Sequence, residues 1–288
     1  MRTAHRRIRR SPVFRAGIAS CAGALLPALV MVLLLAGCAA KAPTAAPGKA
    51  NADEVWKLFK APCAEKAPFA AFSLNASLSF AAQTASGRLN ARFWGDVDGP
   101  LRLDFTTPVG SPFAMWREDA TGWLAYYPGD GAFSHPDTRK GMAKLGMPLP
   151  FDLRELAGAA MGRACEFVPD VYVKAKIAPQ GYEYLFGADA PLKSLILDFE
   201  GEPVRMTGRG IEPWTADLEE YAPVEGFSRP MAQRITLVTP GGTQARLRVK
   251  KIETRAEPWD DKALELYIPT GITVLPLDLM DDVHVVQP

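Results

Sequence analysis

Few residues in this 288-residue chain are suited to acid–base or nucleophilic chemistry. After the first fifteen residues there are two histidines, His135 in a predicted proline-flanked loop and His284 in the tail of the chain. Paired aspartates at 96–98 and 260–261 could in principle act as general acid and base. Both pairs, however, lie among turn-forming residues, where solvated carboxylates are the usual finding. The titratable residues therefore provide no evident catalytic constellation.

Motifs that hold metals, phosphates or nucleophiles are also missing from the sequence. It contains no Cys-x-x-Cys or His-Glu-x-x-His spacing, no Gly-x-Ser-x-Gly elbow and no glycine-rich phosphate loop. The acids and the histidine at 281–284 could chelate a metal, but a polar tail is the simpler interpretation. No clustered basic face suggests nucleic-acid binding. We expect a protein that is not an enzyme and has no cofactor or metal.

The start of the chain has the pattern of an export signal. Residues 1–15 hold six arginines and no acid, and residues 16–37 carry no charge. The apolar run could also be a permanent membrane helix. Against that, Leu-Ala-Gly-Cys at 35–38 resembles the bacterial lipobox, in which Cys38 would receive a diacylglycerol. We expect a lipoprotein signal peptide at 1–37 and a flexible, lipidated tether at 38–53, rich in Ala and Pro.

Two cysteines remain in the body of the chain, Cys63 and Cys165. Export would place them in an oxidising compartment, where they could form one disulfide. Two free buried thiols are the alternative, because the sequence does not report the distance between their Cα atoms.

Hydrophobic periodicity predicts mostly strands after a short helix at 53–61, which Asp53 could cap. The stretch 72–80 alternates apolar and polar residues without exception, as expected for a half-buried antiparallel strand. Two more helices are predicted at 137–145 and 151–161. In 105–116, two apolar stretches flank a Pro-Val-Gly-Ser-Pro corner, which predicts a turn between two strands. Further strands are predicted at 88–94, 101–105, 122–127, 171–177, 182–186, 192–199, 204–207, 214–221, 233–238, 243–253 and 263–268. Such a meander must cover its apolar face. We therefore predict a mainly β (α+β) fold, an open antiparallel sheet or partial barrel with helices across its concave side.

Two loops resemble those of the LolA/LolB-like lipoprotein carriers, and of the outer-membrane receptor LolB in particular. Thr-Pro-Val-Gly-Ser at 107–111 is similar to that family's Asn-Pro-Leu-Gly-Ser loop, and Gly-Met-Pro-Leu-Pro at 146–150 is similar to its Gly-Met-Pro-Ile-Pro between two helices. The resemblance covers roughly residues 69–253. It implies one half-barrel domain, here 54–288 with a C-terminal extension, whose helices form a lid over an apolar cavity.

The resemblance also implies a function and a place in the cell. A lipid-anchored protein on the periplasmic face of the outer membrane would accept lipoprotein acyl chains from a LolA-like periplasmic carrier and release them into outer-membrane lipid. In the family an exposed Leu in the first loop is tied to membrane insertion. Val109 stands at that position, between Pro108 and Gly110, and would be the membrane-inserting residue. The alternative for this loop is a buried turn.

The prediction of a cavity depends on the apolar residues of the predicted strands, which would line it. A packed core is the alternative for each of these residues. A scaffold lipoprotein of the same fold, binding no lipid, is therefore the second hypothesis. The residues expected to line an acyl cavity are Phe72, Leu74, Leu78, Phe80, Leu89, Phe93, Leu101, Leu103 and Phe105.

Overall fold

The computed structural model describes residues 50–82, 86–146, 149–209 and 213–280, all in one compact unit. The predicted signal peptide, Cys38 and nearly all of the tether lie outside the described residues. So do positions 147 and 148 of the second family-like loop, and His284.

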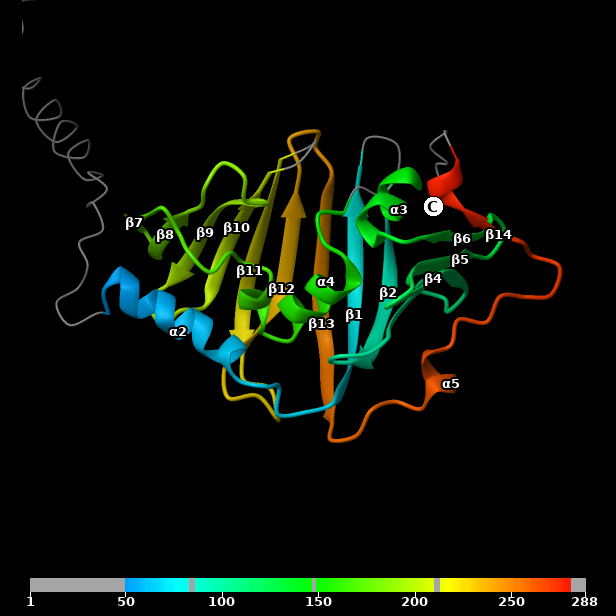
Figure 1. The fold of residues 1–288 in the computed structure, drawn as a ribbon, viewed down its shortest axis with the longest axis horizontal. Coiled ribbons are helices and arrows are strands. Elements are labelled where there is room, and N and C mark those ends of the chain that lie inside the picture. The colour runs from blue at the N-terminus through cyan, green and yellow to red at the C-terminus, as the bar shows by residue number, and fades with distance from the viewer. Residues whose placement is uncertain (1–49, 83–85, 147–148, 210–212, 281–288) are drawn as a thin grey trace, which may run out of the picture. The chain divides into compact units, whose positions relative to one another are not determined.

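The described residues form one open sheet of fourteen strands, which confirms the predicted mainly β architecture (Figure 1). Its spatial order is β14-β6-β5-β4-β3-β2-β1-β13-β12-β11-β10-β9-β8-β7. Every neighbouring pair is antiparallel except β14 with β6. The strands are β1 Ala71–Ala81, β2 Ser86–Asp96, β3 Leu101–Thr106, β4 Pro112–Asp119, β5 Gly122–Tyr127, β6 Gly131–His135, β7 Lys174–Ala178, β8 Gly181–Leu185, β9 Leu192–Asp198, β10 Pro203–Gly208, β11 Trp214–Ala222, β12 Met231–Val238, β13 Gln244–Arg255 and β14 Val274–Pro276.

The strand β6 had no counterpart among the predicted elements, and its discovery corrects the placement of His135. The side chain of His135 is 7% exposed at the end of this strand, and its Nδ1 accepts a hydrogen bond from the backbone N–H of Asp137 at 2.8 Å. The segment is short and ends at a proline, so its alternation was hard to distinguish from a loop.

Helices cover one face of the sheet, the concave face (Figure 1). The helix α2 (Ala52–Ala64) is capped by Asn51 and not by Asp53, because the Asn51 side chain accepts from the Glu54 N–H in a reciprocal capping box. Two shorter helices, α3 (Thr138–Lys144) and α4 (Leu153–Ala160), confirm the predicted helical pair. A 3-10 turn, η1 (Ala164–Glu166), follows α4.

The apolar residues between helices and sheet form two clusters. One lies under α3 and α4, against β1 to β6, and includes Phe72, Phe93, Trp116 and Leu153. The other lies under α2 and η1, against β8 to β12, and is built around Trp56.

The C-terminal segment corrects one prediction: residues 263–268 form no strand. The short helix α5 (Asp261–Leu264), capped by Asp260, takes up the start of that stretch. The chain beyond it is held by side chains in place of a neighbouring strand. Trp94 Nε1 donates to the Ala263 carbonyl at 3.0 Å and Arg102 donates to the Glu265 carbonyl. Alternation at Leu264 and Leu266 therefore reflects burial without a hydrogen-bonded ladder.

After α5 the chain reaches the far edge of the sheet. There β14 pairs with β6, and the 3-10 turn η2 (Leu277–Leu279) places Leu277, which is fully buried, in the first cluster. Lys144 on α3 donates to the carbonyls of Leu277 (2.7 Å) and Met280. The C-terminal segment, residues 256–280, thus runs as a strap from β13 to the lid helix α3.

Candidate functional site

The hairpin between β3 and β4 carries Val109 at its tip, and we call residues 107–111 the finger. The Thr107 N–H donates to the Ser111 carbonyl at 2.8 Å, and the Gly110 N–H donates to the Thr107 carbonyl at 2.9 Å. Gly110 has φ +92°, a left-handed conformation that glycine adopts without strain. Pro108 fixes the opposite side of the turn. The side chain of Val109 is 89% exposed, so the finger is no buried turn.

Neighbouring strands hold the base of the finger. Thr107 Oγ1 accepts from the Ser111 N–H at 3.1 Å, and Asn90 Nδ2 on β2 donates to the Thr107 carbonyl at 3.4 Å. Just below, Phe105 is buried against Trp116, with ring centroids 5.1 Å apart. An exposed apolar tip therefore stands on a well-anchored hairpin.

The nine residues predicted to line a cavity lie together on the concave face, in a packed cluster. Seven of them are buried, and Leu78 and Phe80 pack half-buried against the same cluster. Phe72 and Phe93 meet edge to face with centroids 5.4 Å apart. In the described residues this face is filled by side chains of the sheet and of the lid helices.

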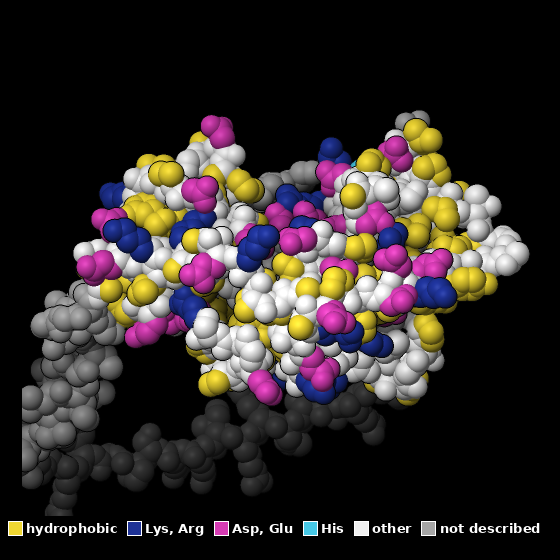
Figure 2. All heavy atoms as spheres, turned by 60° about the horizontal axis from the view of Figure 1, so that its bottom comes forward, with side chains coloured by type: hydrophobic (Ala, Val, Ile, Leu, Met, Phe, Trp, Pro, Cys, Tyr) yellow, Lys and Arg dark blue, Asp and Glu magenta, His cyan; other side chains and the backbone are white. Residues whose placement is uncertain are grey.

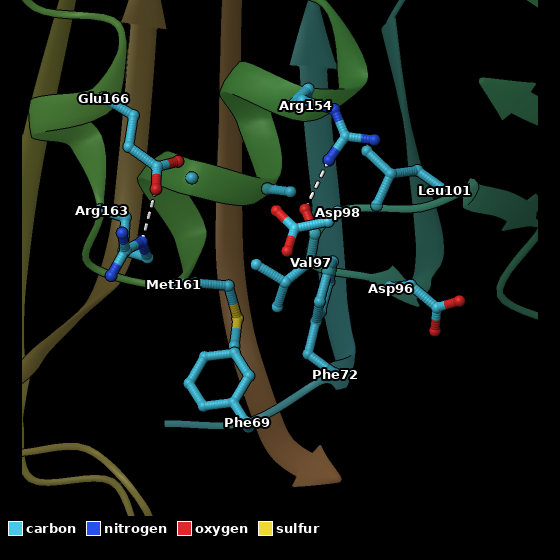
Figure 3. A pocket seen from close by; sticks show the side chains of 12 residues that line it. Phe69, Phe72, Asp96, Val97, Asp98, Leu101, Arg154, Met161, Arg163 and Glu166 are labelled. Atoms are coloured by element: carbon cyan, nitrogen blue, oxygen red, sulfur yellow. Dashed lines mark hydrogen bonds and ion pairs between the residues drawn. The ribbon is translucent and has the colours of Figure 1, made fainter. Parts of the chain in front are cut away.

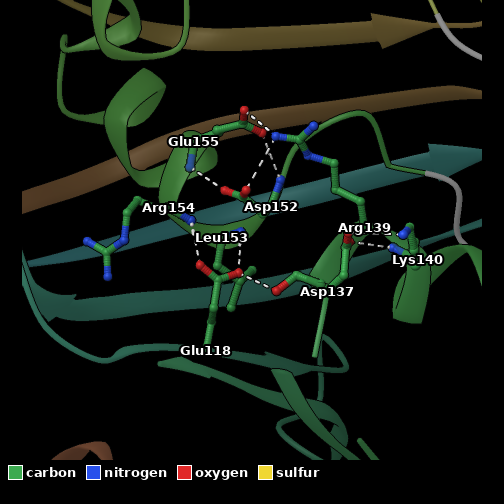
Figure 4. A network of polar contacts seen from close by, with 9 residues as sticks. Glu118, Asp137, Arg139, Lys140, Asp152, Leu153, Arg154 and Glu155 are labelled. Atoms are coloured by element: carbon green, nitrogen blue, oxygen red, sulfur yellow. Dashed lines mark hydrogen bonds and ion pairs between the residues drawn. The ribbon is translucent and has the colours of Figure 1, made fainter. Parts of the chain in front are cut away.

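The lid helices α3 and α4 are fixed to the sheet by one carboxylate, Glu118 on β4 (Figure 4). It accepts from the backbone N–H groups of Leu153 (3.0 Å) and Arg154 (3.3 Å) at the start of α4, and from the Thr138 hydroxyl on α3. A carboxylate at a helix N-terminus is favoured by the helix dipole. No local sequence pattern indicates this role, because Glu118 lies 20 or more residues from its partners.

A second polar group joins the two helices to each other (Figure 4). Arg139 on α3 pairs with Asp152 at 3.4 Å and with Glu155 on α4. Burial raises the pKa of the Glu155 carboxyl, and the nearby Asp152 charge raises it further. The lid is therefore held by a few polar contacts above an apolar surface.

A cleft opens where α4 meets the β2–β3 turn (Figure 3). Two adjoining hollows of about 220 and 580 Å³ share Phe69, Val97 and Arg163 among their walls. Of the nine predicted cavity residues, Phe72 and Leu101 line the smaller hollow. The cleft therefore borders the predicted cavity at Phe72 and Leu101, and the other seven predicted residues do not line the smaller hollow.

Charged residues at the cleft are largely bonded to its walls. Arg154 donates to the Val97 carbonyl at 2.6 Å and to the Gly99 carbonyl, while Arg163 donates to the Pro62 carbonyl at 2.8 Å and pairs with Glu166 at 2.5 Å.

Figure 2 shows side chains of both charges on the face that it turns forward, with hydrophobic groups between them. This surface has no strong charge of one sign.

A disulfide joins Cys63 at the end of α2 to Cys165 in η1, with the Cα atoms 6.0 Å apart. Lys60 adds to this link, because its Nζ donates to the carbonyls of Cys165 (3.0 Å) and Val168 (2.7 Å). The segment after α4 is thus tied to α2, whereas the segment before α4 depends on Glu118.

One member of each acidic pair found in the sequence has a structural role. Asp96 accepts from the Trp259 N–H at 2.8 Å, and Asp260 caps α5. Within the part of the chain that the structure describes, no group of three or more His, Cys, Asp or Glu residues could hold a metal ion. In the same part, no helix is long and apolar enough to cross a membrane.

Comparisons with known proteins give likenesses of fold at low sequence identity. No family model and no curated protein matches the chain. A LolA superfamily protein from Nitrosomonas europaea is 12% identical with TM-score 0.46, covering 75% of this chain and 98% of that one. A putative outer membrane lipoprotein-sorting protein domain from Vibrio parahaemolyticus is 10% identical with TM-score 0.47, covering 74% and 97%.

A DUF1329 family protein from Desulfovibrio piger has TM-score 0.50 at 9% identity, covering 74% of this chain and 98% of that one. At such identity the likeness concerns the fold alone. The large open sheet with a few helices is thus an architecture seen in a solved structure.

Proposed function

We propose that this protein is a lipid-anchored protein of the outer membrane, on its periplasmic face, that accepts the acyl chains of lipoproteins and helps insert them into the membrane. Cys38 carries the anchor in this proposal, and a LolA-like periplasmic carrier delivers the cargo. The family resemblance of the two loops and the open-sheet fold support it. No bond of the cargo is made or broken.

The observation that carries the proposal is the finger. The side chain of Val109 is 89% exposed at the tip of this hairpin. The turn itself is fixed by Pro108, Gly110 and backbone hydrogen bonds. Packing within the described fold therefore gives no reason for an apolar residue at this position. A single exposed valine is common on protein surfaces. Its place at the tip of a rigid turn, where polar residues are usual, favours contact with lipid.

Acyl chains would bind between the lid helices and the sheet. The nine concave-face residues and the undersides of α3 and α4 offer a continuous apolar surface, and each buried methylene contributes about 0.8 kcal/mol. Entry requires the lid to move, because the structure shows this space filled. Glu118, Arg139 and Lys144 hold α3 and α4 by polar contacts, which water can replace when the lid opens.

The filled core supports a second candidate function, a scaffold lipoprotein that binds no lipid. In that case α3 and α4 stay closed and the finger contacts another protein. The two candidates differ in whether lipid enters the concave side.

One transfer experiment separates them. The mature lipidated protein, reconstituted in vesicles, is mixed with a periplasmic carrier loaded with a radiolabelled triacylated lipoprotein. Movement of label to the vesicles, faster than to protein-free vesicles, is expected if the protein accepts acyl chains. A rate equal to that of protein-free vesicles, with no lipid recovered from the purified protein by mass spectrometry, would leave the scaffold function.

A further inference from the structure

The outer face of the sheet, opposite the helices, carries an acid-free patch beside the finger. Directly paired residues of antiparallel strands share a face, so the registers define rows across β12, β13, β1 and β2. In the row nearest the strand ends, Val238 pairs with Gln244, Gln244 with Ala81, and Ala81 with Ser86.

The next two rows are basic. One row holds Thr236, Arg246, Ser79 and Arg88 in order across the four strands. The row after it begins with Arg234 and Arg248 and continues through Ser77, Asn90 and Thr106. None of the three rows contains an aspartate or a glutamate, and the turn residues 83–85 are uncharged in sequence.

Two arginines of the patch have no acidic partner. Among the described residues, Arg88 and Arg246 take part in no ion pair, and both are exposed. Arg234 is paired with Glu219 and Glu220, and Arg248 lies 3.5 Å from Glu220. The acids that pair with Arg234 and Arg248 lie on β11, one strand beyond the patch.

The patch is connected to the finger by a chain of hydrogen bonds. Lys250 on β13 donates from Nζ to Asn90 Oδ1 at 3.1 Å, and Asn90 Nδ2 donates to the Thr107 carbonyl at 3.4 Å. On the antiparallel strands β2 and β3, Asn90 pairs with Thr106. The finger follows Thr106, and so it extends in the direction of the β2 residues that precede Asn90, among them Arg88.

We propose that Arg88 and Arg246, with Arg248 and Lys250 beside them, bind the anionic phosphates of bilayer phospholipids and so hold the Val109 finger against the membrane. Charge complementarity selects the partner: the unpaired guanidinium groups of Arg88 and Arg246, in rows without an acid, match a surface of phosphate groups. The exposed apolar residues on the same side, Val109 (89%) and Val238 (38%), suit the apolar layer just beneath those phosphates.

The patch would fix the orientation of the protein at the membrane, which the lipid anchor alone does not. A tether such as the one expected at 38–53 would keep the protein near the membrane in every orientation. Basic residues attract an anionic bilayer within about one Debye length, roughly 10 Å at 0.1 M salt, so the patch selects the orientation in which the finger points at lipid. This proposal deepens the proposed function and rests on its lipid anchor, but it requires no acyl transfer.

The test measures insertion of the finger in the mature, lipidated protein reconstituted in vesicles. A Val109→Trp variant is compared with the parent protein, whose own tryptophans give the background, and quenching by brominated lipids reports depth. We expect quenching in phosphatidylcholine vesicles that contain phosphatidylglycerol, little in phosphatidylcholine alone, and a decline as salt is raised.

Variants in the Val109→Trp background then test the patch. Each positive charge should raise the ratio of docked to undocked protein about fivefold. The pair Arg88→Glu and Arg246→Glu removes two of these charges and should therefore lower that ratio at least about 25-fold, whereas Arg88→Lys with Arg246→Lys should keep it. The matched control is Lys174→Glu with Lys193→Glu, the same charge change on exposed residues of β7 and β9.

Equal quenching on neutral and anionic vesicles would overturn the proposal, and so would an equal loss in the control pair, which would indicate only net charge. Lack of quenching in every vesicle would overturn it as well. Acyl transfer is measured separately on the same reconstituted protein. Transfer without patch-dependent quenching removes only this inference, and quenching without transfer removes only the acyl-acceptor function.

Discussion

Val109 and Gly141 differ sharply in what surrounds them, because the first is exposed and the second is buried. Val109 projects from the finger with no neighbour that its loss would disturb, and Gly141 in α3 lies against an aromatic ring. Changes at the first should alter function without altering stability, and changes at the second the reverse.

Replacing Val109 with Glu should slow delivery of lipoprotein to the membrane while leaving the free energy of unfolding within about 0.5 kcal/mol of the parent, because an exposed side chain contributes little to stability. The measurement is the transfer assay together with urea denaturation. Val171→Glu is the matched control, since Val171 is 79% exposed beside β7. Delivery at the parent rate by Val109→Glu would rule out the finger's role.

Replacing Gly141 with Ala should destabilise the lid by about 1–3 kcal/mol. The new Cβ would stand 2.6 Å from Cε3 of Trp123 and 2.9 Å from Cβ of His135, and a packed ring cannot give way as a flexible side chain does. The intrinsic gain of Ala over Gly in a helix, about 1 kcal/mol, offsets part of this. Gly187→Ala is the control, since its Cβ meets nothing within 4 Å. Equal stability of the two variants in urea would contradict the close packing.

At the scale of elements, the lid is attached at two ends by different means. The disulfide and Lys60 tie the end after α4 to α2, and Glu118 ties the start of α4 and α3 to the sheet. If acyl chains enter beneath the lid as proposed, we expect it to open from the α3 side, where its attachments to the sheet are hydrogen bonds and not a disulfide.

Removing the disulfide should lower the free energy of unfolding by about 2–5 kcal/mol. The link spans 102 residues, so the unfolded chain gains much conformational freedom when it is broken. The Cys63→Ser, Cys165→Ser double variant is compared with the parent protein in urea, with and without reductant. If the urea midpoint of the parent protein were the same with and without reductant, the two thiols would be free in solution.

At the scale of the whole molecule, the C-terminal strap joins the two ends of the first apolar cluster. It leaves β13, contacts Trp94 and Arg102, pairs β14 with β6, which would otherwise be the edge strand, and ends at α3. An unpaired sheet edge can associate with strands of other molecules. By pairing β14 with β6 the strap covers that edge of β6, and through Lys144 it also holds α3.

Replacing Leu277 with Ala should cost about 2–5 kcal/mol, the usual cost of a large-to-small change at a fully buried site. Hydrogen exchange at β6 and α3 should rise together, because both depend on the strap. Leu279→Ala, two residues on and 79% exposed, should change stability by less than about 0.5 kcal/mol. Faster exchange at α3 without a change at β6 would show that the strap acts on the lid alone.

The sequence by itself determined features that depend on local patterns. The alternation at 72–80 predicted β1, the turn residues at 107–111 predicted the finger hairpin, and the breaker residues at 146–150 separated two helices. Side chains of a strand alternate between faces wherever that strand lies, so such patterns can be read without knowing the partners.

Only the tertiary structure decided what fills the space between the elements. The packing of α3 and α4 on Phe72 and Phe93, the burial of His135 and the exposure of Val109 all depend on segments far apart in sequence. The strap that replaced a predicted strand, and the arginine row formed by β2 and β13, arise in the same way. Burial and charge pairing are properties of the assembled chain, because neighbours in space contribute the volume and the counter-charges that no local pattern contains.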